Sequence, residues 1–328
     1  MMKKILNNPS DVVTEMLAGF VQIHEDVQLL KDTHVIARRT TQDGKVAIIS
    51  GGGSGHEPAH AGFVGDGLLD AAVCGQVFTS PTPDQILAAI KAVHTGAGVF
   101  LIIKNYSGDC MNFEMAKDLA EMEGIDVDFV IVNDDVAVFD SSFTEGRRGV
   151  AGTLFMHKVL GAAAKNGARL TDIKALADNV VTHLASVGFA ISPATVPEVG
   201  KPGFELSATE MEFGIGIHGE PGYRREELKS SREIAVELLD KLEEETSWSS
   251  KKVAVLFNGM GATPLMEQYV FANDVLTLLE ERGYEVVYKK LGNYMTAIDM
   301  AGMSLTLFEL ADAQWLDYLN QHTDAPAW

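Results

Sequence analysis

Short apolar runs alternate along the chain with longer segments of helical spacing, and this alternation is the feature that most restricts its fold. Apolar runs occupy residues 46–49, 69–73, 99–103 and 129–132, and helical patterns separate them, for example over residues 82–90. Such alternation is typical of α/β proteins, in which helices cover a sheet. Because the runs are almost continuously apolar, we expect mostly parallel or mixed sheets with helices on both faces.

A change of texture divides the chain in two. Residues 171–187 carry a helical pattern, and three prolines then mark a loop-rich crossing over residues 186–206. Beyond it, the apolar run at residues 253–257 predicts that strands and helices alternate again. At 328 residues the chain is long enough for two domains of ordinary size. We therefore expect one α/β domain over residues 1–185 and a second over residues 186–328.

The composition is typical of a globular cytoplasmic protein that binds neither nucleic acid nor membranes. Hydrophobic residues make up 46% of the chain and charged residues 22%, which argues against disorder. The net charge of −20 repels phosphate backbones and anionic lipids, so a small molecule or a protein is the expected partner. The N-terminus lacks the apolar core of a signal peptide, and Cys74 and Cys110 have no metal-ligand spacing. Both observations favour a cytoplasmic location with reduced thiols.

The glycine-rich segment at residues 50–58 is the first candidate site. Gly51, Gly52 and Gly53 follow an apolar run and lead to His56. Glycines let backbone N–H groups approach an oxygen-rich ligand, and an imidazole supplies acid/base or nucleophilic chemistry. The segment lacks the lysine of a phosphate-binding P-loop and the third glycine of a dinucleotide-binding loop. We therefore expect a glycine loop that presents a histidine to a small polar ligand.

A second glycine-flanked histidine, His218, lies in residues 213–222 and is also followed by a Glu-Pro pair. Three glycines there satisfy the spacing of a dinucleotide fingerprint, which leaves a nicotinamide-dependent oxidoreductase as a weaker alternative. Pro221 and Gly222 stand where the helix of that fingerprint should begin, which argues against it. Because glycines remove side-chain cover, they favour a functional histidine over one packed in a core.

Lys104 and Asp109 follow the predicted strand at residues 99–103, at the sheet edge where residues 51–55 also emerge. In open α/β sheets ligands bind outside the carboxyl ends of the strands, so we expect both segments to face one site near the domain cleft. Asp109 could be a general base or the N-cap of the following helix, and the two roles do not exclude each other. Lys104 at a buried strand end requires a partner, either Asp109 or a ligand oxygen.

Carboxylates and arginines are mixed after the predicted strand at residues 129–132. Asp134, Asp135 and Asp140 could bind a metal ion, but no histidine or further carboxylate stands at a suitable spacing. Solvated charge is therefore the favoured interpretation. The neighbouring residues 145–148, which include two arginines, could instead contact a partner protein.

Four motifs in order along the chain resemble the substrate-binding subunit of dihydroxyacetone kinase. They occupy residues 51–58, 104–113, 145–152 and 214–222, and the resemblance extends over almost the whole chain. Their number and order make the match specific, whereas a single glycine loop would not. The resemblance implies that the protein binds dihydroxyacetone and presents it for phosphorylation to dihydroxyacetone phosphate.

The resemblance also implies roles for individual residues. In that family a histidine nitrogen bonds covalently to the C2 carbonyl of dihydroxyacetone as a hemiaminal, and His218 matches that histidine. Only a carbonyl accepts an imidazole nucleophile, so covalency separates the ketone from glycerol. His56 and Asp109 match residues that assist catalysis, with Asp109 as the candidate general base. The carboxylate of Glu220, or another partner, could fix the tautomer of His218. The positions that match substrate contacts are Gly53, Ser54, Gly55, His56, Lys104 and Asp109.

The chain ends at Trp328 without the all-helical nucleotide-binding domain that ATP-dependent family members carry. The resemblance therefore implies the split type, with no cofactor in this chain and a separate nucleotide-binding subunit that holds ADP or ATP with Mg²⁺. A phosphotransferase-system phosphohistidine protein would recharge that nucleotide, and the chain would form a homodimer. The alternative is a non-catalytic relative that senses dihydroxyacetone and acts as coactivator of a transcription regulator. The presence of both His56 and Asp109 favours the kinase subunit.

Overall fold

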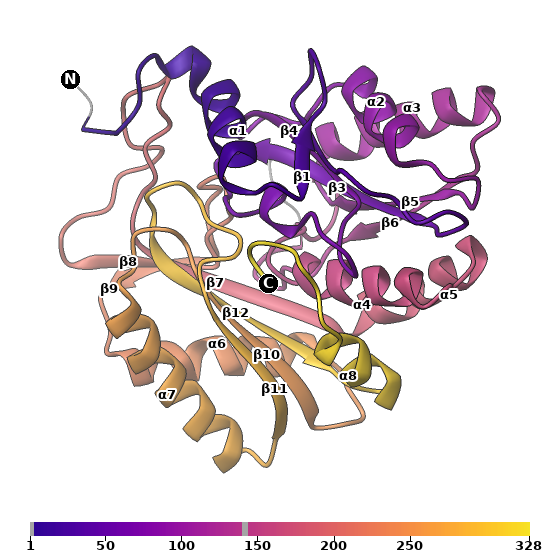
Figure 1. The fold of residues 1–328 in the computed structure, drawn as a ribbon. Helices are drawn as coiled ribbons and strands as arrows, with labels where there is room; N and C mark the ends of the chain where they lie inside the picture. The colour runs from indigo at the N-terminus through magenta and orange to yellow at the C-terminus, as the bar shows by residue number, and fades with distance from the viewer. Residues whose placement is uncertain (1–2, 140–143) are drawn as a thin grey trace.

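The computed structural model describes residues 3–139 and 144–328, and within them the strands form two six-stranded sheets with helices on their faces (Figure 1). Both sheets contain parallel and antiparallel pairs, so the predicted fold class of two mixed, helix-covered α/β sheets is confirmed. In Figure 1 the first sheet lies in the upper half of the molecule and the second in the lower half. Among the described residues no helix combines the length and the apolarity required to cross a membrane.

The first sheet has the strand order β1-β2-β4-β3-β5-β6. Strands β4, β3, β5 and β6 run parallel, while β1 and β2 form an antiparallel edge. The carboxyl ends of the parallel strands therefore meet at one edge of the sheet. The strands are β1 (Val27–Leu29), β2 (Val35–Arg38), β3 (Ala47–Ser54), β4 (Ala71–Val77), β5 (Val99–Lys104) and β6 (Val127–Val132).

Helices cover both faces of the first sheet, because successive residues of each strand point to opposite faces and are apolar on both. The helices are α1 (Val12–Ile23), α2 (Pro83–Val93), α3 (Ser107–Met122), α4 (Thr153–Lys165) and α5 (Leu170–Val180). Ile49 of β3 packs in the core formed with α2 and α3, and its neighbour Ile48 packs in the core formed with α1, α4 and α5.

Helix α4 is buried almost along its whole length, since every side chain from residue 153 to residue 164 is buried. A helix without a polar face requires cover on all sides. The core that contains α4 includes Ile102 of the first sheet and Leu256 of the second, so the two sheets share one apolar layer around this helix.

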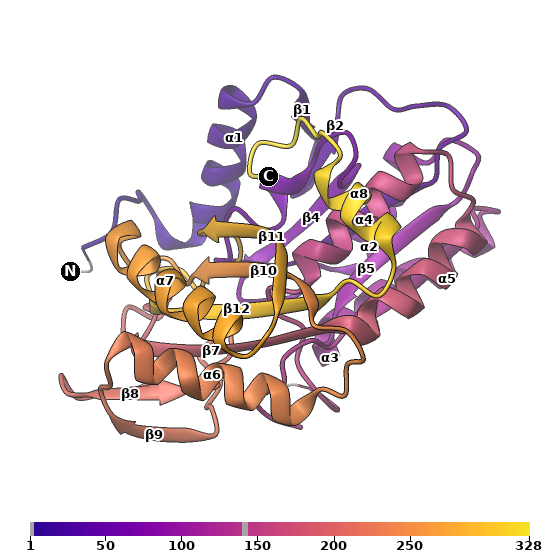
Figure 2. The same ribbon diagram turned by 90° about the horizontal axis from the view of Figure 1, so that it is seen from below.

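The second sheet has the strand order β11-β10-β12-β7-β8-β9. Strands β10 and β11 pair in parallel, and the other neighbours pair antiparallel. Figure 2 shows α6 and α7 together on the outer face of this sheet, where they pack over a separate apolar core. The elements are α6 (Ser231–Glu245), α7 (Leu265–Glu281), α8 (Ala313–Asn320), β7 (Leu184–Ser192), β8 (Glu210–Phe213), β9 (Arg224–Glu227), β10 (Lys252–Gly259), β11 (Glu285–Gly292) and β12 (Ala301–Glu309).

The structure corrects the predicted helix over residues 171–187. Helix α5 ends at Val180, and residues 184–192 form strand β7, which pairs with both β12 and β8 inside the second sheet. The apolar residues at 184–187 fit a buried central strand as well as a helix, and pairing on both sides decides between them. The predicted loop-rich crossing from residue 186 therefore begins too early, while the division of the chain at residues 185 and 186 stays a prediction.

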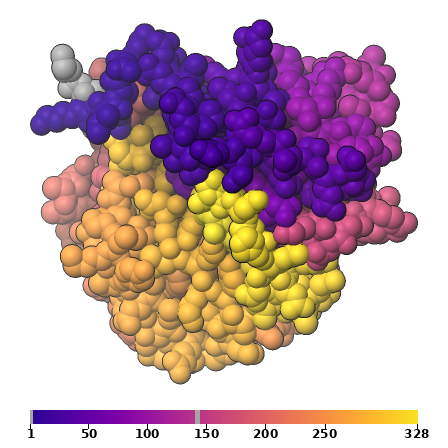
Figure 3. All heavy atoms as spheres, viewed as in Figure 1, coloured from indigo at the N-terminus to yellow at the C-terminus, as the bar shows by residue number. Residues whose placement is uncertain are grey.

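Beside the end of β3, backbone hydrogen bonds join the half of the chain that forms the first sheet to the half that forms the second. The Ile298 N–H donates to the carbonyl of Gly55 at 2.8 Å, and the Thr296 N–H donates to the carbonyl of His56 at 3.1 Å. The C-terminal segment adds a further contact, since the Ala327 N–H donates to the carbonyl of Gly62 at 2.9 Å. Figure 3 shows this yellow segment lying against the indigo N-terminal half.

Candidate active site

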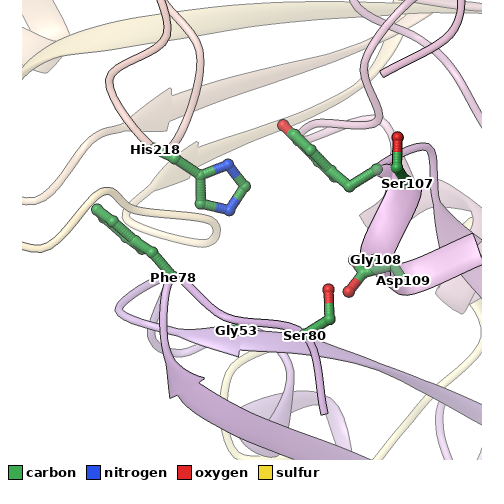
Figure 4. A pocket seen from close by; sticks show the side chains of 8 residues that line it. Gly53, Phe78, Ser80, Ser107, Gly108, Asp109 and His218 are labelled. Atoms are coloured by element: carbon green, nitrogen blue, oxygen red, sulfur yellow. The ribbon is translucent and has the colours of Figure 1, made fainter. Parts of the chain in front are cut away.

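A pocket of about 270 Å³ opens at the carboxyl ends of β3, β4 and β5 (Figure 4). Its volume lies at the small end of ligand cavities, which suits a small polar ligand. Figure 4 shows His218 on one side of the pocket and Asp109 on the other. The lining residues are Gly53, Phe78, Ser80, Tyr106, Ser107, Gly108, Asp109 and His218.

The glycines at residues 51–53 form the last part of strand β3 instead of a separate loop, because they pair in parallel with β4. This corrects the predicted glycine loop. Because these glycines have no side chains, neighbouring atoms can lie close to the backbone of β3. A Cβ at Gly53 would lie 2.6 Å from the backbone nitrogen of Thr79, and a Cβ at Gly52 would collide with the ammonium of Lys104.

His56 and His218 meet at the wall of the pocket. Nε2 of His56 lies 3.1 Å from Nε2 of His218, and Nδ1 of His56 lies 2.7 Å from the carbonyl oxygen of Thr296. The ring of Phe78 stacks on His56, and Tyr106 and Phe78 both meet the His218 ring edge to face. Burial, followed by the charges of His218 and Lys104, lowers the pKa of His56 well below its usual value.

Glu220 holds the other side of the His218 ring. Its Oε1 lies 2.8 Å from Nδ1 of His218, and its Oε2 accepts the backbone N–H of His218 at 2.9 Å. Burial alone would raise the pKa of Glu220, but the hydrogen bond and charge of His218, with the charge of Arg148, outweigh it and lower the pKa to about 2. Glu220 is therefore an anion at neutral pH, and it fixes the tautomer of His218 as predicted.

The hydrogen-bond partners of the two Nδ1 atoms indicate which nitrogens of this histidine pair carry protons. Nδ1 of His56 contacts a carbonyl oxygen, which only accepts, so that nitrogen carries a proton. Nδ1 of His218 contacts an ionised carboxylate and carries a proton for the same reason. In two neutral rings both Nε2 atoms would then be bare, and two lone pairs cannot form a hydrogen bond. A hydrogen bond across the 3.1 Å contact would need one additional proton between the two rings.

Lys104 lies beneath the pocket floor and orients Asp109. Its ammonium donates to the carbonyl of Gly51 at 2.9 Å, to Nε2 of His60 at 3.1 Å and to Oδ2 of Asp109 at 3.4 Å, which accounts for all three N–H groups. Among the described residues, Oδ1 of Asp109 has no hydrogen-bond partner. Of the two partners considered for Lys104, Asp109 forms an ion pair with it. Asp109 lies in the first turn of α3, so its predicted alternative role as N-cap is wrong.

Comparison with known proteins decides the family. The Dak1 domain profile matches residues 18–327 of the chain. The dihydroxyacetone-binding subunit DhaK of the PTS-dependent dihydroxyacetone kinase of Lactococcus lactis subsp. lactis is 58% identical to it, over 99% of both chains. The chain belongs to the Dak1 family. The resemblance predicted from the four motifs is thereby confirmed.

Two other relatives mark the range of functions among proteins similar to this Dak1 chain. The DhaKLM operon coactivator DhaQ of Lactococcus lactis subsp. lactis is 45% identical, over 99% of this chain and 100% of the relative. The crystal structure of the dihydroxyacetone kinase of C. freundii in complex with AMP-PNP and Mg²⁺ is 32% identical, with a TM-score of 0.93. That comparison covers 100% of this chain and 61% of the other, so the larger kinase contains a further part.

The Dak1 structure brings some predicted site residues to the pocket and places others behind it. Gly53, Asp109 and His218 line the pocket, whereas His56 is fully buried behind His218. The Ser54 hydroxyl donates to the carbonyl of Gly75 at 2.7 Å and lines, with Gly55, a separate cavity of about 90 Å³. The predicted roles of all these residues, including a substrate contact by buried Lys104, stay predictions.

Sequence reasoning missed several residues of the site. Phe78 and Tyr106 hold the His218 ring between them. The only signal for Tyr106 was its place shortly after the predicted strand at residues 99–103, and Phe78, five residues beyond the predicted strand at residues 69–73, carried no clear signal. His60 and His157 are fully buried under Lys104, and burial together with the Lys104 charge lowers the pKa of both. No local pattern distinguishes these two histidines from exposed ones.

The acidic block after β6 is structural rather than solvated, which corrects its favoured interpretation. Asp134 and Asp135 are both almost fully buried. Asp134 accepts the backbone N–H groups of Val150 and Gly152 at 2.8 and 2.7 Å, and Asp135 forms a buried ion pair with Arg148 at 2.7 Å. Asp140 lies outside the described residues. Within residues 3–139 and 144–328, no group of three or more His, Cys, Asp or Glu side chains could hold a metal ion.

Proposed function

We propose that this chain binds dihydroxyacetone as a covalent hemiaminal on Nε2 of His218 and presents a terminal hydroxyl for phosphorylation. A separate subunit with adenine nucleotide and Mg²⁺ would donate the phosphoryl group, and a phosphotransferase-system phosphohistidine protein would recharge that nucleotide. The observation that carries the proposal is the contact of His56 and His218 through their Nε2 atoms at the wall of a small pocket, with Asp109 opposite.

The shared proton supplies the acid that the addition needs. It moves from Nε2 of His218 to Nε2 of His56, 3.1 Å away, which frees the His218 lone pair to attack C2. As the C–N bond forms, the π electrons of the carbonyl move to its oxygen, and that oxygen takes the proton from His56. The low pKa of His56 favours this delivery, because a weakly basic imidazole releases a proton readily.

Glu220 stabilises the positive charge of the site both before and after the addition. Before the addition the histidine pair carries one positive charge through the shared proton. After the addition the substituted His218 ring carries that charge, while the former carbonyl oxygen is a neutral hydroxyl. The carboxylate of Glu220, 2.8 Å from Nδ1 of His218, lies beside the cation throughout and requires no rearrangement.

Asp109 is the proposed general base for phosphoryl transfer. Lys104 engages Oδ2, which leaves Oδ1 available to accept the proton of the terminal hydroxyl while the hydroxyl oxygen attacks the phosphorus. The covalent bond to His218 fixes the ketone so that this hydroxyl can be aimed in line, and positioning provides much of the catalysis in phosphoryl transfer. We place this activity in the cytoplasm, in a homodimer as the family resemblance implies.

A coactivator that senses dihydroxyacetone is the second candidate, because DhaQ is 45% identical over nearly the whole chain. Such a sensor needs the covalent bond but has no use for a base at the terminal hydroxyl. The higher identity to the kinase subunit, at 58%, and the position of Asp109 in the pocket wall support the kinase function.

One experiment separates these candidates. Dihydroxyacetone labelled with ¹³C at C2 is added to the chain, and the carbon spectrum is recorded with the exposed His322→Gln variant as control and the His218→Gln variant as test. We expect a tetrahedral C2 signal with wild type and the control and none with His218→Gln. A nucleotide-binding subunit and phosphoryl donor are then added, and dihydroxyacetone phosphate is assayed. A signal without product would favour the sensor, and a signal that persists in His218→Gln would refute the proposal.

A further inference from the structure

Helix α3 exposes a row of apolar side chains that its own fold does not bury. Met111, Met115, Leu119 and Met122 are 64, 50, 38 and 84% exposed. Their spacing of four, four and three residues places them on one face of the helix, over a length of about 16 Å. We call these four residues the α3 stripe.

The α3 stripe is additional to the face that holds the helix on the sheet. Phe113, Ala116 and Ala120 are fully buried in the core with β3 and β5, and they account for the amphipathic pattern that the fold needs. A surface helix normally presents polar residues on its other side, so a contiguous exposed apolar row indicates an interaction site.

The position of the α3 stripe connects it to the pocket. The first turn of the same helix contributes Ser107, Gly108 and Asp109 to the pocket lining, and the stripe starts two residues later at Met111. A phosphoryl donor has to reach the pocket at this helix end. A protein that carries the donor and lies along α3 would cover both the pocket mouth and the stripe.

Acidic side chains accompany the α3 stripe along one side. Glu114 and Asp118 lie next to it on the helix surface, and neither forms an ion pair within residues 3–139 and 144–328. The whole chain carries a net charge of −20, so this surface attracts basic partners. The matching surface is therefore apolar with lysine or arginine at its edge.

A second exposed apolar group lies on α7, and its position separates it from the site. Leu265, Met266, Tyr269 and Val270 are all more than half exposed. They belong to the second half of the chain, and none of them lines the pocket. A partner that has to reach the substrate is thus better matched by α3.

We propose that the α3 stripe, with Glu114 and Asp118, is the docking surface for the subunit that carries the adenine nucleotide. That subunit presents an apolar ridge flanked by lysine or arginine. The assignment rests on the proposed function, because only a phosphoryl-donating partner has to lie over the pocket mouth. Methionine side chains suit such a surface, since their flexibility lets them fit a partner that binds and leaves in each cycle.

The test compares two double variants with matched spacing. Met111→Lys/Met115→Lys places charges on the α3 stripe, and Met266→Lys/Val270→Lys places them on α7 at the same i, i+4 spacing. The probe is the purified nucleotide-binding subunit of the Lactococcus lactis kinase with ADP and Mg²⁺, and its Kd is measured by calorimetry. We expect the α3 pair to raise the Kd roughly tenfold or more, and the α7 pair to change it less than about twofold. Lysine keeps helix propensity and length, so both variants should fold.

A charge variant adds an independent readout. Glu114→Gln/Asp118→Asn should weaken binding and make it less sensitive to salt, because it removes two attractive charges. In every variant the ¹³C signal of the His218 adduct should equal that of wild type, since none of these side chains touches His56, Asp109 or His218.

The outcomes separate the docking surface from the proposed function. Loss of subunit binding in the α3 pair alone supports the docking surface, whether or not the adduct forms. Unchanged binding in the α3 pair, greater loss in the α7 pair, or no binding of the subunit to wild-type protein that forms the adduct would each overturn it. Absence of the adduct in wild type would overturn the proposed function instead.

Discussion

Nε2 of His56 lies 3.1 Å from Nε2 of His218, although 162 positions separate the two residues in the sequence. Neither ring could donate to the other without an additional proton, and in the proposed function the pair stores that proton for addition to the carbonyl. His56→Gln removes the store while leaving the nucleophile. We expect adduct formation to slow by roughly 100-fold or more. Exchange between free and bound ketone, measured by ¹³C saturation transfer, would report this rate, and a wild-type rate in His56→Gln would contradict the proton route.

Glu220→Gln tests the charge beside the ring. The amide keeps the shape of the carboxylate but cannot neutralise a cation, so the ketone affinity should fall by roughly tenfold to a hundredfold. Glu212→Gln is the matched control, since Glu212 is a buried carboxylate paired with Arg225. Titration of the ¹³C signal gives both affinities. Equal losses in the two variants would indicate general destabilisation rather than a role at His218.

The same variant has a signature in acid. The native pKa of Glu220 is about 2 and its ordinary value is 4.5, so its ionisation stabilises the fold above pH 4.5 and this contribution is lost as the pH falls toward 2. The contribution at neutral pH is at most roughly 3 kcal/mol. Urea unfolding of wild type between pH 5 and pH 2 should therefore show a loss of stability that is smaller in Glu220→Gln.

His157→Phe should protect the protein from mild acid. His157 is fully buried with neither ring nitrogen bonded among the described residues, and burial followed by the Lys104 charge lowers its pKa to about 3. The unfolded chain takes up a proton below pH 6.5 that the folded chain does not, so wild type loses stability as the pH falls. Between pH 7.5 and 5 this loss is about 2 kcal/mol for one histidine.

The measurement is urea unfolding at those two pH values. His157→Phe should reduce the difference between them, while the exposed His322→Gln should leave it unchanged. An identical pH dependence in His157→Phe and wild type would mean that the buried imidazole is charged in the folded state.

Gly52→Ala tests why β3 ends in glycines. A Cβ at Gly52 would collide with the Lys104 ammonium, which would then have to leave Asp109 or the carbonyl of Gly51. We expect a loss of roughly 1 to 3 kcal/mol in unfolding free energy. Gly19→Ala is the control, because Gly19 lies in α1 with no atom within 4 Å of its added Cβ, and it should stabilise the helix slightly. Thermal melting of both variants decides the matter.

The sequence located the four parallel strands because their signals are local, and it placed the ends of β5 and β6 within one residue, whereas β3 and β4 continue to Ser54 and Val77, beyond the predicted ends at residues 49 and 73. Continuous apolar runs identified the parallel strands, and the polar residues Lys104 and Asp109 stood directly after one of them. The carboxyl ends of parallel strands share an edge, so their convergence followed from topology. The motif resemblance added the family, which the comparisons bear out.

The predictions that were wrong concern residues whose structure depends on long-range contacts. Residues 184–187 fit a helical pattern, and only pairing with β12 and β8 makes them strand. Asp134 and Asp135 look solvated until Arg148 and the backbone N–H groups of residues 150 and 152 are placed around them. The burial of His60 and His157 under Lys104 is also a property of assembly, since it requires α4 to lie between both sheets.

Backbone hydrogen bonds from Thr296 and Ile298 to His56 and Gly55 join the half of the chain that carries His56 to the half that carries His218. The two halves thus form one frame around the pocket. Such a frame resists hinge bending at its centre, so we expect a ligand to enter a pocket whose walls already stand at their final spacing. We therefore expect discrimination by size at entry, with longer carbon skeletons excluded from the pocket. We expect mutations at these hydrogen bonds between the two halves, away from the reacting groups, to be the ones that widen the range of ligands.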